Sequence, residues 1–402
     1  MNLPIPKLLK IFLYLKIYFV LSVLFVTLSG QPTIANEFPA QPCRQFSLEN
    51  SSMRQFASDN IKNIPFIRNN NFIDSIDFTN GKINWSFDAG GIIAPQILVN
   101  SEYTYLANTV KKNGIEENIL IVRTISGYSG LTIWKTEIGF NSDFVNKIVN
   151  KITPEQTYIY DLKDGLLVRS NSCYVRINKL NGSLKWKKCI ASDSIGSENS
   201  DVMSDIVSDI SGGILAFSDH NYLYLLAVET GEIITKITTE SEITAISLID
   251  KSTVIYGDKK GNVRSLDTGN KKVFWTVKSG GAISGIVKTE KGLLISSFDN
   301  FVYMFDINGR HKIWKKRFAG RIRVKPSVKD NLAIIVGDER NSYFVNISDG
   351  KIVRQVSLPD NEHFLQFSGF VNEYCFFLTD KRILVFGVEN GICPKEESGV
   401  VL

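Results

Sequence analysis

The sequence has little of what catalytic and metal sites are usually built from. Only three of its 402 residues are histidine, and none stands at metal-ligand spacing from a cysteine, an aspartate or a second histidine. It contains no Gly-x-Ser-x-Gly elbow, no phosphate-binding P-loop and no Cys-x-x-Cys pair. We therefore interpret His220, His311 and His363 as ordinary surface residues, and we expect no metal, no cofactor and no enzymatic activity.

An excess of charge of either sign is also lacking. Lys and Arg number 46 and Asp and Glu number 41, and three of the lysines fall within the first 35 residues, which hold no acid. Without that stretch the balance is 43 to 41. A surface so close to neutral offers no bulk electrostatic reason to bind nucleic acid, so we expect no nucleic-acid partner.

The first 35 residues differ from the rest of the chain. Ile17–Leu28 is a twelve-residue stretch without charge, too short to cross ~30 Å of hydrocarbon. Thr33–Ala35 offers the small residues that a signal peptidase reads, so we predict a secretory signal peptide over 1–35 and a periplasmic protein. If Lys16 is tolerated, Ile11–Leu28 instead serves as an uncleaved anchor, and membrane association is otherwise peripheral.

What the chain does contain is one short phrase repeated along most of its length. A turn of small residues that includes glycine is followed, two to six residues after the glycine, by tryptophan or an aliphatic residue. The turn glycines are 38 to 52 residues apart, a period that marks a repeat architecture. The turns and the residues that follow them are Asn80-Gly81 with Trp85, Ser129-Gly130 with Trp134, Asn181-Gly182 with Trp186, Thr230-Gly231 with Ile233-Ile234, Thr268-Gly269 with Trp275, Asn308-Gly309 with Trp314, Asp349-Gly350 with Ile352-Val353, and a truncated copy at Asn390-Gly391.

Each repeat reads as a series of hairpins. Leu293–Ile295 is a short apolar run, Asp299-Asn300 interrupts it, and Phe301–Phe305 is a second run rich in strand-favouring residues. Asn308-Gly309 then leads into Lys312–Trp314. Asn-Gly and Asp-Asn tolerate the positive φ of tight hairpin turns, so these runs are predicted strands.

An earlier apolar run, such as Ile283–Val287, supplies a fourth strand to each unit. A four-stranded unit cannot bury its own faces, so the units must stack radially, as in an all-β propeller of antiparallel blades. We predict seven blades over 81–393, with Ile83–Phe87 as the N-terminal strand that completes the last blade and closes the ring. Eight blades remain open if Pro65–Phe78 supplies further strands. Residues 36–80 are then an N-terminal extension and 394–402 a tail.

Five cysteines accompany the export signal, so disulfides are expected. Cys173 and Cys189 flank the turn at residues 181–182 almost symmetrically and can face each other across adjacent strands. Cys43 with Cys393 would tie the two ends of the propeller together. Cys375 lies inside an apolar run and reads as core.

A cluster of basic residues is the first candidate for partner binding. Seven Lys and Arg residues occur between His311 and Lys325, on a predicted outer strand and the loop that follows it. Lys315, Arg317, Arg321 and Arg323 are our candidate residues. The cluster either docks an acidic partner or an anionic lipid surface, or is a charged blade edge that discourages aggregation.

Extra chain length is the second candidate. The early repeats exceed the later ones by about ten residues, inserted near Lys111–Asn118, Asn150–Thr157 and Ala191–Met203. Long loops on a rigid scaffold commonly carry binding, although loops merely tolerated by solvent would look the same. From the third insertion we select its acidic and apolar positions as candidates, namely Asp193, Ile195, Glu198 and Asp201.

The phrases at Leu266–Trp275, Ala227–Gly231 and Phe305–Trp314 resemble the pyrroloquinoline-quinone-like propeller repeat, over roughly Ile83–Gly391. One group with this repeat is the quinone-dependent dehydrogenases, and that resemblance would imply a quinone and calcium. The sequence has no adjacent cysteine pair, and no calcium ligand set can be placed in it.

The other group is the cofactor-free periplasmic propellers, above all the BamB family, which assists assembly of outer-membrane β-barrels. That resemblance implies a non-catalytic scaffold whose partners are the assembly machinery and unfolded barrel clients. It also implies partner binding by loops on one face, which favours Ala191–Met203. The chain departs from the family at Gln31, where a lipoprotein would carry its lipidated cysteine. A secreted interaction propeller with another partner is the remaining alternative.

Overall fold

A computed structural model describes most of the chain from residue 42 to residue 393. The described ranges are 42–47, 51–52, 63–68, 70–78, 82–94, 96–100, 102–111, 118–139, 157–170, 173–190, 208–337, 340–389 and 393. The chain divides into two compact units, Met1–Phe38 and Pro39–Leu402, and every described residue belongs to the second. The predicted signal peptide and C-terminal tail therefore lie outside the described residues. Within the ranges above, no helix is long and apolar enough to cross a membrane.

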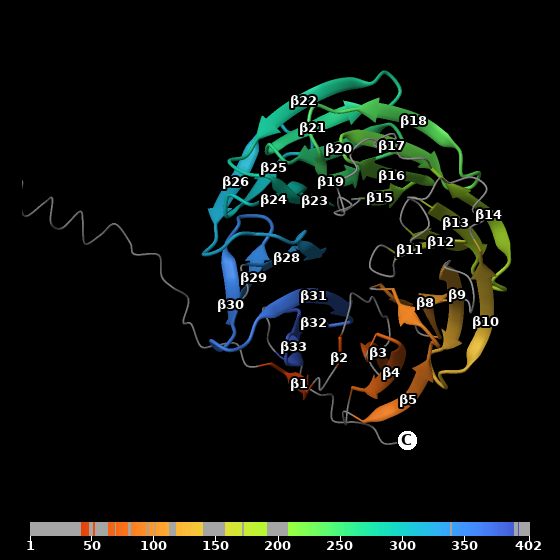
Figure 1. The fold of residues 1–402 in the computed structure, drawn as a ribbon. Coiled ribbons are helices and arrows are strands. Elements are labelled where there is room, and N and C mark those ends of the chain that lie inside the picture. Colours follow the sequence, from red (N-terminus) through yellow and green to blue (C-terminus); the bar gives the residue numbers. More distant parts are fainter. Residues whose placement is uncertain are drawn as a thin grey trace, which may run out of the picture. The chain divides into compact units, whose positions relative to one another are not determined.

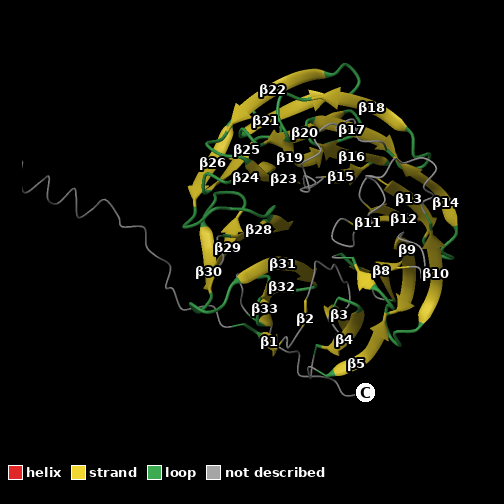
Figure 2. Cartoon of the chain, viewed as in Figure 1, coloured by secondary structure: helices red, strands yellow, loops and turns green. Residues whose placement is uncertain are grey.

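The described elements are all β-strands, arranged as eight sheets. Figure 1 shows the sheets following one another around a common axis, and Figure 2 shows the same strands joined by loops and turns. Blade 1 contains β2 (Ser51–Ser52), β3 (Asn63–Arg68), β4 (Phe72–Asp77) and β5 (Ile83–Asp88). Blade 2 contains β6 (Ile92–Ile93), β7 (Leu98–Val99), β8 (Tyr103–Lys111), β9 (Asn118–Ser126) and β10 (Thr132–Ile138). Blade 3 contains β11 (Thr157–Leu162), β12 (Gly165–Ser170), β13 (Cys173–Asn178) and β14 (Leu184–Cys189). Blade 4 contains β15 (Ser208–Ser211), β16 (Ile214–Asp219), β17 (Tyr222–Ala227) and β18 (Ile233–Thr238).

The remaining four blades follow the same order, from the innermost strand outwards. Blade 5 contains β19 (Ile243–Leu248), β20 (Thr253–Asp258), β21 (Asn262–Asp267) and β22 (Lys272–Lys278). Blade 6 contains β23 (Ile283–Thr289), β24 (Gly292–Ser297), β25 (Phe301–Phe305) and β26 (Lys312–Arg317). Blade 7 contains β27 (Ser327–Lys329), β28 (Leu332–Val336), β29 (Asn341–Asn346) and β30 (Ile352–Ser357). Blade 8 contains β31 (Phe364–Val371), β32 (Tyr374–Thr379), β33 (Arg382–Gly387) and, as its fourth strand, β1 (Arg44–Ser47).

The prediction of an all-β propeller with four-stranded antiparallel blades is confirmed, but the count of seven is wrong. Residues Ile83–Phe87 do not complete the last blade, because β5 pairs with β4 in blade 1. Two of the strands that make the eighth blade possible come from the segment that the sequence left open, Pro65–Phe78: β4 lies within it, and β3 begins two residues before it. The propeller therefore begins before residue 81. The strand that pairs with β33 is β1, from Arg44 opposite Val385 to Ser47 opposite Arg382.

The cores lie between neighbouring blades. One cluster joins Ile73 and Trp85 of blade 1 to Phe376 and Val385 of blade 8, and Phe78 packs against both blades. The ring of Phe78 lies 5.0 Å from that of Tyr374 and 6.3 Å from that of Phe46 on β1, measured between centroids. Because each sheet buries both faces in this way, its middle strands are apolar on both sides rather than alternating.

The repeated glycine and tryptophan meet between blades. The indole Nε1 of Trp134, on β10, donates to the Lys179 carbonyl of the next blade at 3.0 Å, and its ring lies against Gly182. Trp85, Trp186 and Trp314 make the same bond to the turns of blades 2, 4 and 7 at 2.7 to 3.0 Å. A tryptophan and the glycine of the following repeat therefore form one interlock between two blades, which explains why the sequence repeats both.

Each outer strand from β5 to β30 also carries a β-bulge at one fixed place. The ladder skips the residue directly before the tryptophan position, so that the outer strand has one residue more than its neighbour there. The skipped residues are Asn84, Ile133, Lys185, Ile234, Phe274, Ile313 and Val353. Bulges on edge strands bend them away from a partner strand, so this feature protects the rim against edge-to-edge aggregation.

Candidate interaction face

The strand order gives the propeller two distinct faces. In an antiparallel blade, the turn between the second and third strands and the connection to the next blade lie at the same end. We call this end the crossover face. The opposite end, formed by the turns between first and second and between third and fourth strands, is the turn face.

All three long insertions join strand ends on the crossover face. They connect β8 to β9, β10 to β11, and β14 to β15. Most of each insertion lies outside the described residues, and so do the candidates Asp193, Ile195, Glu198 and Asp201. The chain runs from Cys189 to Ser208 before β15 begins, whereas it needs only the residues between Thr238 and Ile243 to reach β19. The second and third insertions therefore lie in connections between blades, whereas the first lies between β8 and β9, whose nine residues each also lengthen blade 2.

The predicted basic cluster lies partly on the same face. Residues 317–325, which we call the basic crossover, lead from β26 to β27. Phe318 and Ile322 are buried and anchor it, while Arg317, Arg321 and Arg323 are exposed. The Phe318 N–H donates to the Asn300 carbonyl at 2.9 Å.

The inner end of the basic crossover lies over the innermost strand of blade 6. A Cβ placed on Gly285 of β23 would lie 2.6 Å from the Cα of Lys325, so the two backbones pack directly against each other. Because β26 is the outermost strand of blade 6 and β23 the innermost, the basic crossover spans the blade radially.

Lys315 is separated from the other three candidates. Its ammonium lies 3.7 Å from the ring centroid of Phe301 and 5.1 Å from that of Tyr303, on the side of blade 6. In such a cation–π contact the ammonium packs against the aromatic rings of its own blade. Lys236 stacks on Tyr222 and Tyr224 of blade 4 in the same way, at 4.2 and 5.3 Å. Lys315 therefore belongs to a repeated structural contact. Of the four basic candidates, only the three arginines lie on the crossover face.

Two apolar side chains accompany the basic crossover. Phe298, in the turn between β24 and β25, is 41% exposed, and Val324 within the crossover is 38% exposed. Two backbone hydrogen bonds hold that turn against neighbouring segments. The Phe298 N–H donates to the Ala282 carbonyl at 2.9 Å, and the Asn300 carbonyl accepts from the Phe318 N–H. An exposed aromatic ring beside arginines is a composition typical of protein interfaces.

Other connections on this face are acidic and are held by ion pairs. Arg264 of blade 5 donates to Glu240 of the preceding connection and to the buried Asp258, both at 2.7 Å. Arg382 of blade 8 binds Glu362 of its preceding connection at 2.7 Å. These pairs fix the connections to the blades that follow them.

Asp258 is held in its charged form. Burial raises the pKa of its carboxyl, but hydrogen bonds from Asn262 and Arg264 lower it by more, so the pKa lies below its ordinary value. The pKa of Glu362 is lowered in the same way, with burial opposed by Arg382 and Thr379. A carboxyl whose folded pKa is depressed stabilises the fold above its unfolded pKa of about 3.9, and this contribution is lost as the pH falls through the folded value.

Replacing Asp258 with Asn is therefore expected to lower the free energy of unfolding at pH 7 by about 2 kcal/mol, because the buried hydrogen bonds lose their charged acceptor. Urea denaturation followed by fluorescence measures the difference, which should shrink at pH 3, below the unfolded pKa of the carboxyl, because the unfolded wild type then binds a proton. Asp360→Asn, at an exposed ion pair with Arg340, is the control and should change stability by less than about 0.5 kcal/mol. A difference for Asp258→Asn that is equal at both pH values would contradict this account.

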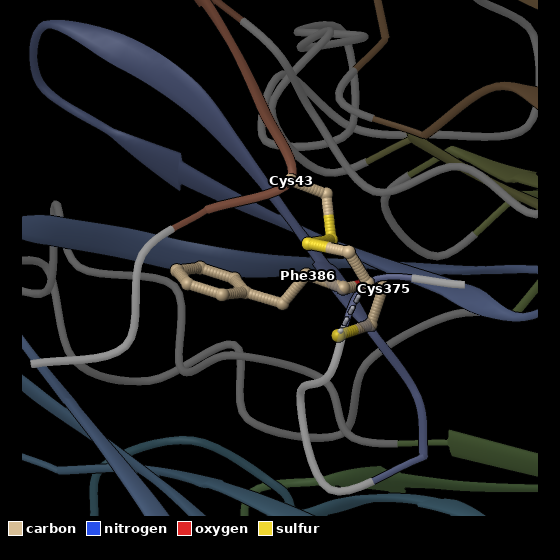
Figure 3. The surroundings of a disulfide bond; sticks show 4 residues. Cys43, Cys375 and Phe386 are labelled. Atoms are coloured by element: carbon tan, nitrogen blue, oxygen red, sulfur yellow. Dashed lines mark hydrogen bonds between the residues drawn. A yellow bond between two sulfur atoms is a disulfide. The ribbon is translucent and has the colours of Figure 1, made fainter. Parts of the chain in front are cut away.

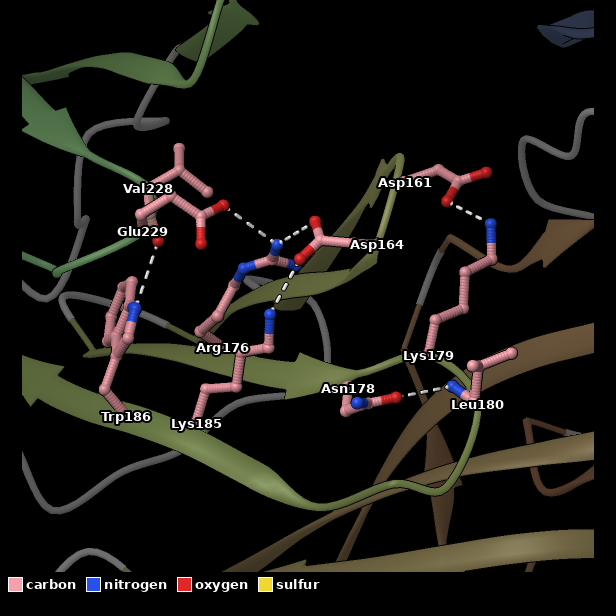
Figure 4. A network of polar contacts seen from close by, with 10 residues as sticks. All are labelled: Asp161, Asp164, Arg176, Asn178, Lys179, Leu180, Lys185, Trp186, Val228 and Glu229. Atoms are coloured by element: carbon pink, nitrogen blue, oxygen red, sulfur yellow. Dashed lines mark hydrogen bonds and ion pairs between the residues drawn. The ribbon is translucent and has the colours of Figure 1, made fainter.

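The turn face carries a network that the sequence did not reveal. Arg176 on β13 is fully buried, and its Nη2 donates to Asp164 at 2.5 Å and to Glu229 of blade 4 at 3.2 Å (Figure 4). Lys185 binds the same Asp164 at 2.7 Å. Hydrogen bonds from Lys185 and Arg176 lower the pKa of Asp164 to about 2. The network joins blade 3 to blade 4 and leaves Arg176 inaccessible to a partner.

Disulfides join both predicted cysteine pairs. Cys173 and Cys189 lie directly opposite each other on β13 and β14, with Cα atoms 4.0 Å apart. Cys43, beside β1, is bonded to Cys393, with Cα atoms 5.4 Å apart. Figure 3 shows this second disulfide together with the buried thiol of Cys375, which donates to the Phe386 carbonyl.

The histidines have no common centre, because His220 and His363 lie on the crossover face and His311 lies on the turn face. His220 contacts Asp219 at 2.7 Å in the turn between β16 and β17, and His311 is exposed after the turn that leads into β26. His363 lies in the connection to β31. Among the residues that the structure describes, no three His, Cys, Asp or Glu side chains gather as a metal site would require.

Known proteins share this architecture. A family profile described as outer membrane protein assembly factor BamB matches residues 66–277 and 259–362. Crystal structures of similar fold include the computationally designed Ika8 protein, with a TM-score of 0.64 at 11% identity, covering 86% of this chain and 99% of that one. BamB from Moraxella catarrhalis gives a TM-score of 0.56 at 10% identity, covering 86% of this chain and 98% of that one. At such identities the structures show a shared fold alone. None of the curated proteins matches the chain.

Proposed function

This chain belongs to the family of the outer membrane protein assembly factor BamB, and we propose that it is a non-catalytic, protein-binding scaffold that assists assembly of outer-membrane β-barrels. The observation that carries the proposal is the gathering of three long insertions and the basic crossover on one face of a rigid propeller. Loops on a rigid scaffold are where binding residues concentrate. The partners we propose are the assembly machinery and its unfolded barrel clients.

The proposed location is the periplasm. Two disulfides are typical of a protein that folds in an oxidising compartment, and the predicted signal peptide agrees with export. We also infer that β1 closes the ring by serving as the outer strand of blade 8, held there by the disulfide between Cys43 and Cys393. A closed ring has no free end blade at which to open, which suits a scaffold that must keep its face in place.

Affinity capture tests the function. The purified full chain, crosslinked in envelope extracts, is expected to recover a component of the barrel-assembly machinery. A variant with residues 191–203 replaced by a short Gly-Ser linker should recover less of it, while its urea midpoint stays unchanged because β14 and β15 are retained. Recovery of no assembly component would refute the proposal. If the linker variant recovers as much of the assembly component as the full chain, the third insertion does not contribute to binding.

The non-catalytic part of the proposal has a separate test. After incubation with pyrroloquinoline quinone and calcium, the chain is expected to reduce no redox dye in the presence of alcohols or sugars. Turnover above that of the heat-denatured chain would replace the scaffold proposal with a quinone-dependent dehydrogenase.

A further inference from the structure

We propose that the basic crossover, residues 317–325, is a docking site for a short, extended, acidic peptide segment of a protein partner. This inference deepens the proposed scaffold function and rests on it for the identity of the partner as a protein. It names the chemistry of the segment that this part of the crossover face would recognise.

Charge sets this connection apart from the others that the structure describes. Between Ile307 and Lys329 the chain has nine Lys and Arg residues and no Asp or Glu. The connection to blade 5 instead carries Glu240 and Glu242, and the connection to blade 8 carries Asp360 and Glu362. Those carboxylates are paired with Arg264, Lys259, Arg340 and Arg382, whereas the basic crossover has no acid of its own, so an acidic segment is attracted to this sector of the face. Such a pattern selects both the partner and its orientation.

The positive charge is available for binding. Across the described residues, no carboxylate forms an ion pair with Arg317, Arg321 or Lys325. The nearest acid in the adjoining turn, Asp299, already accepts hydrogen bonds from the Tyr303 hydroxyl and the Gly280 N–H. A carboxylate from another molecule would therefore meet guanidinium groups that are not neutralised by these neighbours.

The shape of the crossover limits the length of the segment. It spans blade 6 from β26 to β23, which is three strand spacings, or about 14 Å at about 4.8 Å each. An extended peptide advances about 3.3 Å per residue, so roughly four to five residues cover the distance. The crossover is fixed at both ends, by Phe318 at Asn300 and by Lys325 over Gly285, so little ordering is required on binding.

The side chains favour a peptide over a lipid surface. Arginine presents a planar fork that binds a carboxylate through two parallel hydrogen bonds, and three of the four basic side chains between residues 317 and 325 are arginine. Phe298 and Val324 add apolar surface at the same place, which suits alternating acidic and apolar side chains of an extended strand.

The test uses a short fluorescent peptide in which glutamate alternates with phenylalanine and leucine, and fluorescence anisotropy with the full chain. Binding should weaken as salt is raised, and the same peptide with lysine in place of glutamate should not bind. Arg317→Glu combined with Arg321→Glu should weaken binding at least about tenfold, since both charges become repulsive. Lys259→Glu combined with Lys260→Glu makes the same change in charge elsewhere on this face, and should change affinity by less than about twofold. Unchanged urea midpoints show that both variants fold.

Three results would overturn the inference. These are equal binding of the glutamate and lysine peptides, equal effects of the two charge reversals, or binding to phosphatidylglycerol vesicles through Arg317 and Arg321 without binding to the peptide. Failure of the scaffold function looks different. If the chain captures no barrel-assembly component but binds the acidic peptide through Arg317 and Arg321, the docking site stands and the assembly role falls.

Discussion

Replacing Cys43 and Cys393 together with serine is expected to lower the free energy of unfolding by about 5 to 6 kcal/mol, because the disulfide closes a loop of 350 residues in the unfolded chain. Loop-closure entropy grows with the logarithm of loop length, so few cross-links in the protein could restrict the unfolded state more. Urea denaturation of the oxidised double variant and of the wild type measures the difference.

The control is the double variant Cys173→Ser with Cys189→Ser, whose disulfide joins residues only 16 apart. It removes the same chemical groups but should cost about 3 kcal/mol, since a loop of about 15 residues loses less entropy. Double variants leave no unpaired thiol in either case. If the short loop cost as much as the long one, loop length would not be the source of the stability.

The long disulfide also acts on the folded state through β1. That strand is only four residues long and pairs with β33 alone. Its side-chain contacts include Phe46 against Phe78, Arg44 over the same Phe78 ring at 4.9 Å, and Gln45, which accepts from Arg382 at 2.7 Å. Hydrogen exchange of β1 and β33 should therefore accelerate in the Cys43 and Cys393 variant, while exchange in blade 3 stays unchanged.

The repeat made most of the fold predictable, because the turn glycine of a repeat and the tryptophan of most repeats, which form the interlocks, recur together along the sequence. The blade count failed for a physical reason as well. β1 and β2 are short and polar in sequence, and β3 contains Pro65, which argues against a strand because it lacks an N–H. The pairing of β1 with β33 joins the two ends of the chain, and no local periodicity reports such a contact.

The site was predictable where charge is concentrated in sequence. Arg317, Arg321 and Arg323 could be found from composition, but only the strand register separates them from Lys315, which stacks on Phe301. The Arg176 network could not be found. The two carboxylates that bind Arg176 belong to different blades, and their distances from it in sequence do not recur in other repeats. The only signal in the sequence was an arginine within the mostly apolar strand β13.

The interlock between blades gives the second large effect. Replacing Gly182 with Ala is expected to lower the free energy of unfolding by about 3 kcal/mol. Gly182 has φ +72°, where an L-residue costs about 1 to 2 kcal/mol. A Cβ there would lie 2.5 Å from Cε3 of Trp134 and 2.8 Å from Oγ1 of Thr136, and overpacking costs about 1 to 3 kcal/mol more.

Two other glycines separate these contributions. Gly213 has φ +80° with nothing within 4 Å of a Cβ, so Gly213→Ala should show the backbone cost alone, about 1 kcal/mol. Gly269 is the turn glycine of blade 5, but the left-handed place four residues before the tryptophan, which Gly182 holds in blade 3, is taken there by Lys271 at φ 55°. The preceding outer strand also has Thr235, and not tryptophan, opposite Leu225. A Cβ at Gly269 meets only Oδ1 of Asp267, at 3.4 Å, so Gly269→Ala should change stability by less than about 0.5 kcal/mol. Urea denaturation ranks the three variants. Equal losses for Gly182→Ala and Gly213→Ala would show that contact with Trp134 contributes nothing, and the interlock would then not explain why glycine and tryptophan repeat together.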